Sequence, residues 1–166
     1  PDTVALVNPK TNLATQVISA DGKVLGSFYL ENRTNVNYSD ISPYIIQGLV
    51  STEDERFYKH SGIDLRGTAR ATIYLGKKGG ASTITQQLAK MLFTEEPGNG
   101  FERVFQKFQE WIISVQLERQ YTKEEIITLY LNKFDWINQA VGIKSAASVY
   151  FNSAPDTLKI EQAAML

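Results

Sequence analysis

The sequence predicts a mostly α-helical domain that follows a small N-terminal β-hairpin. Beyond about residue 40, apolar residues recur at helical spacing, and residues typical of helix starts precede several of these segments. Before residue 40, two strand-forming runs flank Asp21-Gly22, a pair that favours a tight turn. We therefore divide the chain of 166 residues into an N-terminal segment, 1–40, and a helical domain, 41–166.

The hairpin and the first helix come first in the chain. The two strand-forming runs cover residues 15–20 and 23–29 and are rich in β-branched and aromatic side chains. Ser42-Pro43 then fits the N-cap and first residue of a helix, and apolar residues continue at helical spacing to Val50. The first predicted helix therefore begins at about residue 43.

Three more helices have clear start signals. Asp64 is a suitable N-cap for a helix that ends near Gly76. Thr83-Ile-Thr-Gln86 and Thr122-Lys-Glu-Glu125 both fit the capping box, in which two side chains bond to each other's backbone N–H groups. These signals predict helices that begin at about residues 65, 84 and 123.

A long apolar stripe lies between the two capping boxes. Its members are Phe101, Val104, Phe105, Phe108, Trp111, Ile112 and Val115. A helix that faces the core explains the stripe most simply; in the alternative, part of it rests in a membrane interface together with residues 91–93. Segments 142–150 and 158–166 also have helical patterns, whereas 77–80 and 94–100 are typical of mobile loops.

Composition excludes several classes of protein and site. A net charge of −1 argues against a nucleic-acid-binding protein, which usually has a strongly basic surface. The chain has no cysteine and a single histidine, so disulfides, thiolate zinc sites and histidine-rich metal sites are excluded. No apolar run is long enough to span a bilayer, and the abrupt ends of the chain suggest a fragment of a longer protein.

The first candidate for chemistry is the charged run from Glu53 to Arg56 at the end of the first predicted helix. Taken alone, such a run is usually a solvated helix end. However, aromatic, turn and capping residues follow it closely, including Phe57, His60 and Asp64. This neighbourhood is expected to fix a carboxylate in a partly dry cleft, where burial would raise its pKa toward that of a general base.

The second candidate is the start of the helix at residue 84. Glycines followed by small hydroxyl residues, 79–83, are expected to expose backbone N–H groups that attract anions such as phosphate. Gln86, Gln87 and Lys90 would extend the polar contacts along the helix. An ordinary capped helix after a flexible loop explains the local chemistry equally well, and the spacing of glycine and lysine excludes a Walker loop.

The third candidate is the pair Lys107 and Glu110 in the long predicted helix. Three residues apart, they share one helix face, so a surface ion pair is the simplest interpretation. A functional interpretation requires Glu110 to face Glu53 across a cleft, because paired carboxylates recur in chemistry at an anomeric carbon.

In this order, these segments resemble glycosyltransferase family 51, the peptidoglycan glycosyltransferase domain of class A penicillin-binding proteins and monofunctional transglycosylases. Glu53-Asp54…Phe57…His60…Gly62…Asp64 is similar to the first motif of that family, and Gly80-Ala-Ser-Thr-Ile-Thr-Gln-Gln-Leu-Ala-Lys90 to the second. Lys107…Glu110 is similar to the third, Tyr130-Leu-Asn132 with Gly142 and Tyr150-Phe151 to the fourth, and Leu158…Glu161…Ala163-Ala164 to the start of the fifth.

The resemblance implies a lysozyme-like helical fold with a membrane-associated jaw, and lipid II as the substrate. It implies that Glu53 takes the proton from the 4-hydroxyl of the acceptor, lipid II, whose oxygen attacks the anomeric carbon of the growing strand with inversion. Glu110 would be the second catalytic carboxylate. The substrate-binding residues that it implies are Asp54, His60, Asp64, Arg70, Ser82, Thr83, Gln86, Gln87, Lys90, Arg103 and Lys107.

The resemblance also implies the setting of the reaction. The partners would be lipid II, the nascent glycan strand, the outer face of the cytoplasmic membrane and other cell-wall synthesis proteins. The location would be periplasmic, with a transmembrane anchor outside this chain. The family makes a divalent cation, Mg²⁺ or Mn²⁺, plausible at the pyrophosphate, and the domain would be truncated at its C-terminus.

Four positions depart from the family pattern. Gln106 stands where arginine is usual, and Arg103, one turn earlier, is the candidate to replace the lost charge. Met91 replaces asparagine, while Ile137 and Gln139 replace glycines. Two other functions stay open, a lysozyme-like glycan hydrolase or lytic transglycosylase and a non-catalytic glycan- or lipid-binding module. The helix start at 82–90 argues against the hydrolase, which has no pyrophosphate to bind, and the two glutamates argue against the binding module.

Overall fold

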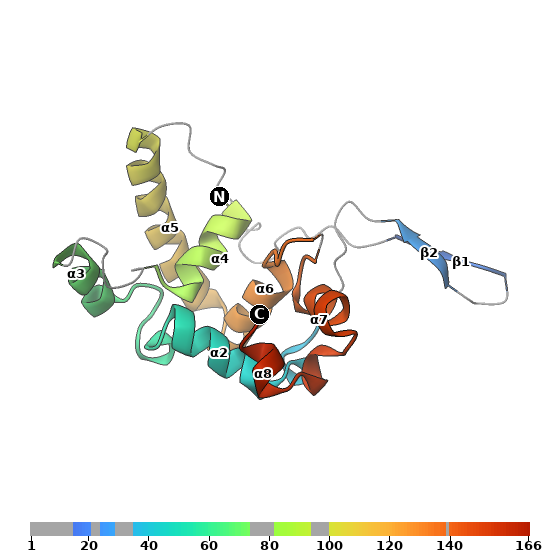
Figure 1. Ribbon diagram of the computed structural model, residues 1–166. Helices are drawn as coiled ribbons and strands as arrows, with labels where there is room; N and C mark the ends of the chain where they lie inside the picture. Colours follow the sequence, from blue (N-terminus) through green and yellow to red (C-terminus); the bar gives the residue numbers. More distant parts are fainter. Residues whose placement is uncertain (1–14, 21–23, 29–34, 74–81, 94–99, 139) are drawn as a thin grey trace.

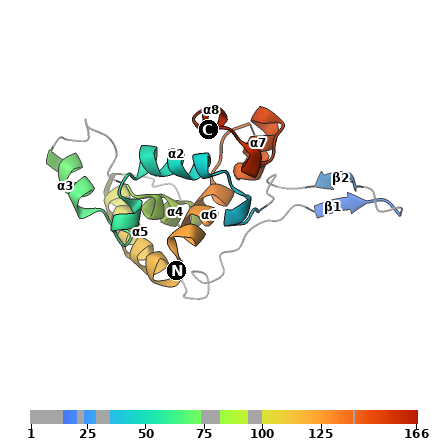
Figure 2. The same cartoon turned by 90° about the horizontal axis from the view of Figure 1, so that it is seen from below.

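The computed structural model describes residues 15–20, 24–28, 35–73, 82–93, 100–138 and 140–166 of the chain. Most of these residues are helical, as the sequence predicts. Two short strands, β1 (Thr15–Ile18) and β2 (Val24–Phe28), pair antiparallel and lie apart from the helices (Figures 1 and 2). The predicted turn at Asp21-Gly22, the loop predicted at 77–80 and residues 94–99 of the loop predicted at 94–100 lie outside the described residues. Gly100 is described, and it begins a helix instead.

Helix α2 (Pro43–Glu53) begins where the sequence predicts it. The Ser42 hydroxyl accepts a hydrogen bond from the backbone N–H of Tyr44, which makes Ser42 the N-cap. The same hydroxyl donates to the carbonyl of Leu158 at 2.9 Å and so ties the start of α2 to the C-terminal segment. Helix α8 (Ile160–Ala163) packs beside α2 (Figure 2).

Helix α4 (Ile84–Phe93) lies at the centre of the helical domain, packed against α5 (Gly100–Gln120) and α6 (Lys123–Lys133). Its apolar residues up to Ala89 are fully buried, as are facing positions on both neighbouring helices, while residues 91–93 are partly buried. The fully buried apolar residues of these three helices are Ile84, Leu88, Ala89, Leu117, Ile126, Ile127 and Leu131. Because this packing fixes α4, the residues at its N-terminus have well-defined positions next to the end of α2.

Of the three later predicted helix starts, two have the expected caps and one differs. Asp64 accepts from the backbone N–H of Arg66 at the start of α3 (Leu65–Ile73). The Thr122–Glu125 capping box is present in full at α6. At α4, Thr83 accepts from the N–H of Gln86 as predicted, but the Gln86 side chain turns to the carbonyl of Gly62. The predicted α4 box is therefore only half formed, because a tertiary partner replaces the local one.

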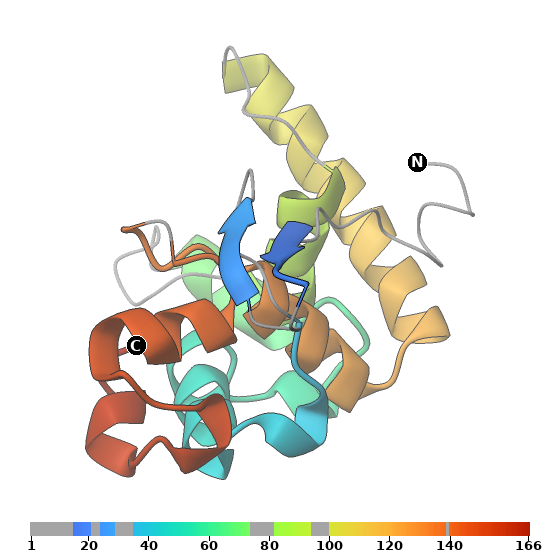
Figure 3. The same ribbon diagram turned by 90° about the vertical axis from the view of Figure 1, so that its right-hand side faces the viewer.

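The apolar stripe predicted on α5 does not face the core. Phe101 is 91% exposed, Phe105 is 66% exposed and Ile112, in the C-terminal half, is 61% exposed. The buried face of the helix is a different one, and its residues are Gln106, Glu110, Ile113, Ser114 and Leu117. The N-terminal half of α5 extends away from the other helices (Figures 1 and 3). The prediction of a core-facing stripe is therefore wrong, because the amphipathic pattern does not say what the apolar face meets.

The C-terminal segment is less helical than its pattern predicts. Helix α7 (Ile143–Phe151) follows Gly142, but the segment predicted at 158–166 forms only the four residues of α8. Three short 3-10 turns complete the described fold: η1 (Tyr38–Asp40), η2 (Phe57–Lys59) and η3 (Pro155–Thr157). In the described part of the chain, every helix is too short or too polar to cross a bilayer.

Candidate active site

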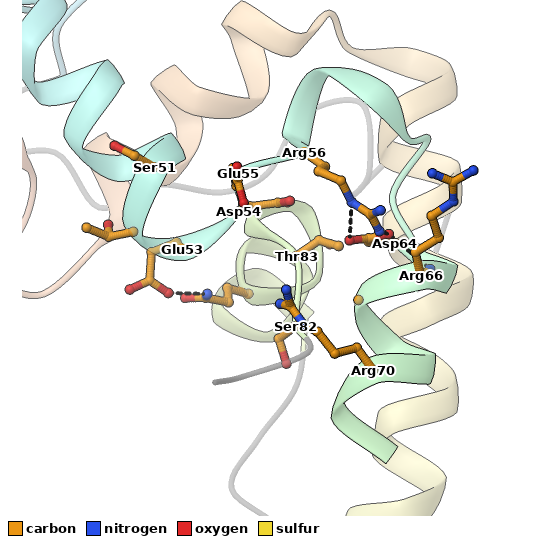
Figure 4. A pocket seen from close by; sticks show the side chains of 13 residues that line it. Ser51, Glu53, Asp54, Glu55, Arg56, Asp64, Arg66, Arg70, Ser82 and Thr83 are labelled. Atoms are coloured by element: carbon orange, nitrogen blue, oxygen red, sulfur yellow. Dashed lines mark hydrogen bonds and ion pairs between the residues drawn. The ribbon is translucent and has the colours of Figure 1, made fainter. Parts of the chain in front are cut away.

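Glu53 is the last residue of α2, and its side chain lines a hollow of about 740 Å3 (Figure 4). The end of α2, the loop that follows it, helix α3 and the start of α4 together form the wall of the hollow. The side chain of Arg70 extends from α3 toward Ser82 across it (Figure 4). The charged residues of its lining are Glu53, Asp54, Glu55, Arg56, Asp64, Arg66 and Arg70.

A chain of two hydrogen bonds connects Glu53 to the core. The amide nitrogen of Gln87 donates to Oε2 of Glu53 at 2.8 Å, and the hydroxyl of Tyr130 donates to the amide oxygen of Gln87 at 3.0 Å. Burial raises the pKa of Tyr130 well above its ordinary value, and the nearby Glu53 carboxylate raises it further. Tyr130 therefore keeps its proton and remains a donor to Gln87.

A second hollow, of about 250 Å3, adjoins the first, because Ser82 and Gln87 line both. Its other lining residues are Gln86, Lys90, Arg103, Gln106, Lys107 and Glu110. The ammonium of Lys107 lies 2.7 Å from the Glu110 carboxylate and donates to the Ser82 hydroxyl at 2.9 Å. Glu110 is buried and paired, and three cations against one carboxylate leave this hollow with an excess of positive charge.

Asp54, next to Glu53, is buried and fully engaged by the protein. Both of its carboxylate oxygens lie 3.0 Å from Nε2 of His60, and one also accepts from the backbone N–H of Ile84 at 3.1 Å. Asp54 is thus the anion at the positive end of α4. The sequence led us to expect N–H groups free for a phosphate there, and this expectation is wrong for the N–H groups of Ile84 and Gln86, which protein oxygens occupy.

The carbonyl of Gly62 is the second anchor between the loop and α4. It accepts from the hydroxyl of Thr83 at 2.7 Å and from the amide nitrogen of Gln86 at 3.2 Å. Thr83 and Gln86 are both buried, and their contacts hold the start of α4 against the loop that contains Gly62. The amide oxygen of Gln86 is buried and has no hydrogen-bond partner among the described residues.

Asp64 forms an ion pair with Arg56 at the far side of the larger hollow (Figure 4). Burial acts to raise the pKa of Asp64, but the backbone N–H of Gly67 and the Arg56 guanidinium outweigh it and lower that pKa. The pair leaves Arg66 and Arg70 as the other cations of the lining. This side of the hollow is therefore basic, while the end of α2 is acidic.

The structure brings the residues predicted from the sequence together in two adjoining hollows. Glu53, Asp54, Asp64 and Arg70 line the larger one, and Lys90, Arg103, Lys107 and Glu110 the smaller one, with Gln106 also in its wall. His60 lines neither, and its side chain lies behind Asp54. Glu53 itself is exposed, so the partly dry cleft expected around its carboxylate is wrong.

Sequence reasoning missed the polar partners that lie behind the site. Tyr130 sits in an apolar helical pattern that predicts a core position, and nothing in that pattern shows that its hydroxyl reaches Gln87. Glu118 was missed in the same way: its buried carboxylate accepts from Thr85 at 2.6 Å and from Lys123 at 2.7 Å. Lys123 also donates to the carbonyl of His60 at 2.8 Å and so connects the loop between α2 and α3 to Glu118 of α5.

The described residues contain no group of three or more histidine, aspartate or glutamate side chains placed to hold a metal ion. Of the acidic side chains in the two hollows, Glu110 pairs with Lys107 and Asp64 with Arg56. These residues do not form the donor set of a resident cation, which stays an expectation from the resemblance.

Comparison with known proteins gives a consistent result. The family model described as Transglycosylase matches residues 21–166. Penicillin-binding protein 1A of Pseudomonas aeruginosa is 38% identical over 171 residues, covering 100% of this chain and 20% of that protein. Penicillin-binding protein 1A of Escherichia coli is 34% identical over 170 residues, with 100% and 20% covered, and penicillin-binding protein 1F of Bacillus subtilis is 34% identical over 157 residues, with 92% and 21% covered. The chain spans about a fifth of the length of these relatives.

Proposed function

The chain belongs to the transglycosylase family of peptidoglycan glycosyltransferases, and on that premise we propose that it polymerises lipid II into β-1,4-linked glycan strands with Glu53 as the general base. One observation supports this proposal above the others. An exposed carboxylate lines one hollow and three cations line the next, and Ser82 and Gln87 separate them. The start of α4 therefore lies between a candidate base and a candidate site for a pyrophosphate leaving group.

In the proposed reaction, the acceptor sugar of lipid II lies in the larger hollow. Oε2 of Glu53 is held by Gln87, and Oε1 has no protein partner among the described residues, so Oε1 takes the proton of the acceptor's 4-hydroxyl. The 4-hydroxyl oxygen of the acceptor then attacks the anomeric carbon of the donor strand from the face opposite the pyrophosphate. Attack from that face inverts the α-linked donor and produces a β-1,4 bond.

The bond between the anomeric carbon and the pyrophosphate oxygen breaks as the new bond forms, and its electron pair leaves with undecaprenyl pyrophosphate. Lys90, Arg103 and Lys107 are placed to stabilise the negative charge on that leaving group. Glu110 fixes the ammonium of Lys107, which also contacts Ser82. Arg103 supplies the charge that Gln106 lacks relative to the family pattern. A divalent cation that arrived with the pyrophosphate would add to this charge, but no proposed step requires one.

The proposal includes a setting and a scaffold. Segment 41–166 would be the lysozyme-like glycosyltransferase domain, working at the outer face of the cytoplasmic membrane with the nascent strand and other cell-wall synthesis proteins. The exposed apolar side chains of α5, including Phe101, Phe105 and Ile112, support a membrane contact, because a patch of this kind seldom faces water.

The test is polymerisation of labelled lipid II by the full-length protein. Glu53→Gln preserves size and removes the base, so we expect the rate to fall by at least about 100-fold, the usual contribution of general base catalysis. Glu55→Gln is the matched control, because Glu55 lines the same hollow and is also exposed. Near-normal polymerisation by Glu53→Gln would exclude Glu53 as the base.

The same preparation separates this function from that of a hydrolase. Incubation with purified peptidoglycan should release no soluble fragments, whereas a lysozyme-like hydrolase or lytic transglycosylase would release them. Release of fragments without polymer formation would overturn the proposed function.

A further inference from the structure

We propose that Tyr130 and Gln87 act as a pair of positioning residues that keep the Glu53 carboxylate oriented for proton abstraction. This inference rests on the proposed function, since it assumes that Glu53 is the base. It concerns two residues from different helices, α4 and α6, that contact each other behind the larger hollow.

The chemistry of the three side chains fixes the direction of both hydrogen bonds. An ionised carboxylate only accepts hydrogen bonds, so the amide nitrogen of Gln87, not its oxygen, must face Glu53. The amide oxygen then faces Tyr130, whose hydroxyl must donate. With both bonds formed, the amide has one orientation, and Oε2 of Glu53 has one fixed donor.

Tyr130 is a rigid donor. It is 2% exposed, and its ring stacks on that of Phe134 with the ring centres 5.4 Å apart. Its high pKa keeps the hydroxyl protonated throughout the pH range in which a carboxylate base works. Glu53, in contrast, is exposed at the end of a helix, where a glutamate side chain samples several rotamers. The fixed hydroxyl of Tyr130 thus restricts the orientation of the Gln87 amide, and through it the rotamers of the exposed Glu53 side chain.

The other charged groups around Glu53 do not replace this support. Asp54 is held by His60 and Ile84, and Arg56 is paired with Asp64. Among the described residues, the hydrogen bond that reaches the Glu53 carboxylate comes from Gln87. The charged and titratable groups that face it are Asp54, Glu55, Arg56 and Asp64 from the loop, Arg66 and Arg70 from α3, and Tyr130 from α6.

Tyr130→Phe tests the inference, because it keeps the ring and its stacking and removes only the donor. Without the donor, the Gln87 amide can turn over, and it no longer holds the Glu53 carboxylate in one orientation. We expect kcat to fall about three- to tenfold, because a general base must lie within hydrogen-bond reach of the proton that it takes. KM for lipid II should change less than twofold.

Tyr121→Phe is the control, since it removes the hydroxyl of a half-buried tyrosine that lines neither hollow. Its kcat and KM should match those of the wild type. Thermal unfolding of both variants checks that the loss of a hydroxyl has not loosened the fold. A wild-type kcat in a stably folded Tyr130→Phe protein would overturn the inference.

A double-mutant cycle with Gln87→Ala distinguishes positioning through Gln87 from a general effect on stability. If Tyr130 acts through the amide, Tyr130→Phe should cost nothing further in kcat once Gln87 is alanine. Additive losses would contradict the inference. The proposed function would still stand after additive losses if the wild-type protein polymerises lipid II and the Glu53→Gln variant is inactive. Activity in Glu53→Gln would instead remove the premise of both.

Discussion

Gly62 is the position where a single methyl group should do most damage to the site. Its φ of +90° lies in a region that side chains rarely adopt, and its carbonyl accepts the hydrogen bonds of Thr83 and Gln86. A Cβ at this position would lie 2.8 Å from the backbone carbon and oxygen of Ser114. These are backbone atoms of α5 and cannot turn aside as a flexible side chain would.

Two costs add up in Gly62→Ala. The unfavourable backbone conformation costs about 1–2 kcal/mol, and forcing a methyl group into a packed contact costs about 1–3 kcal/mol. We therefore expect the free energy of unfolding to fall by about 2–5 kcal/mol. For a domain of this size, each kcal/mol shifts the melting temperature by about 2–4 °C, so the Tm should fall by roughly 4–20 °C.

Thermal and urea unfolding measure this loss directly. Gly48→Ala is the matched control: Gly48 lies inside α2, and a Cβ there meets the carbonyl oxygen of Ala163 at an ordinary 3.8 Å. That substitution should stabilise the protein by about 0.5–1 kcal/mol, because alanine is the better helix former. A Gly62→Ala protein that melts within a degree of the wild type would refute the reasoning about backbone contact at this position.

Three further predictions concern the supports of the site and one strained loop. Lys123→Met leaves the buried Glu118 carboxylate without its cation and should cost about 3 kcal/mol in urea unfolding, and adding Glu118→Gln should recover part of that loss. Asp64 has a lowered pKa in the folded protein, so its ionised carboxylate stabilises the fold above its unfolded pKa of about 3.9. This stabilisation is lost as the pH falls through the folded pKa. Asp64→Asn should therefore lower the free energy of unfolding at pH 7 and have little effect on it near pH 2. Ile137 has a φ of +70°, so Ile137→Gly should raise the Tm by relieving about 1 kcal/mol of backbone strain.

The fold was predictable where local chemistry decides it. Ser42-Pro43 and Thr122–Glu125 define helix starts through contacts within four residues, and both helices begin there. The surroundings of the apolar stripe on α5 were not predictable in the same way, since the spacing of Phe101, Phe105 and Ile112 shows one apolar face but not what covers it. At residues 158–166 a helical pattern yielded only one turn, because so short a segment gains little from helix formation without tertiary packing.

The site was predictable in its residue types but not in its connections. Glu53, Lys107 and Glu110 were identified with the motifs around them, and the structure places them at two adjoining hollows. Sequence could not show that Asp54 occupies the N–H of Ile84, because those residues are 30 positions apart. It predicted an anion site at the start of α4, and the protein itself provides the anion.

The contrast between Glu53 and Asp54 shows how one short segment separates two tasks. Asp54 is buried, holds α4 and His60 and has no oxygen left without a partner, so it suits a structural role. Glu53 is exposed and held at one oxygen only. A general base must return its proton to solvent after each transfer, so access to water favours turnover, while full burial would trap the proton. The hydrogen bond from Gln87 therefore restricts the orientation of the Glu53 carboxylate, as burial would, while the carboxylate stays accessible to water.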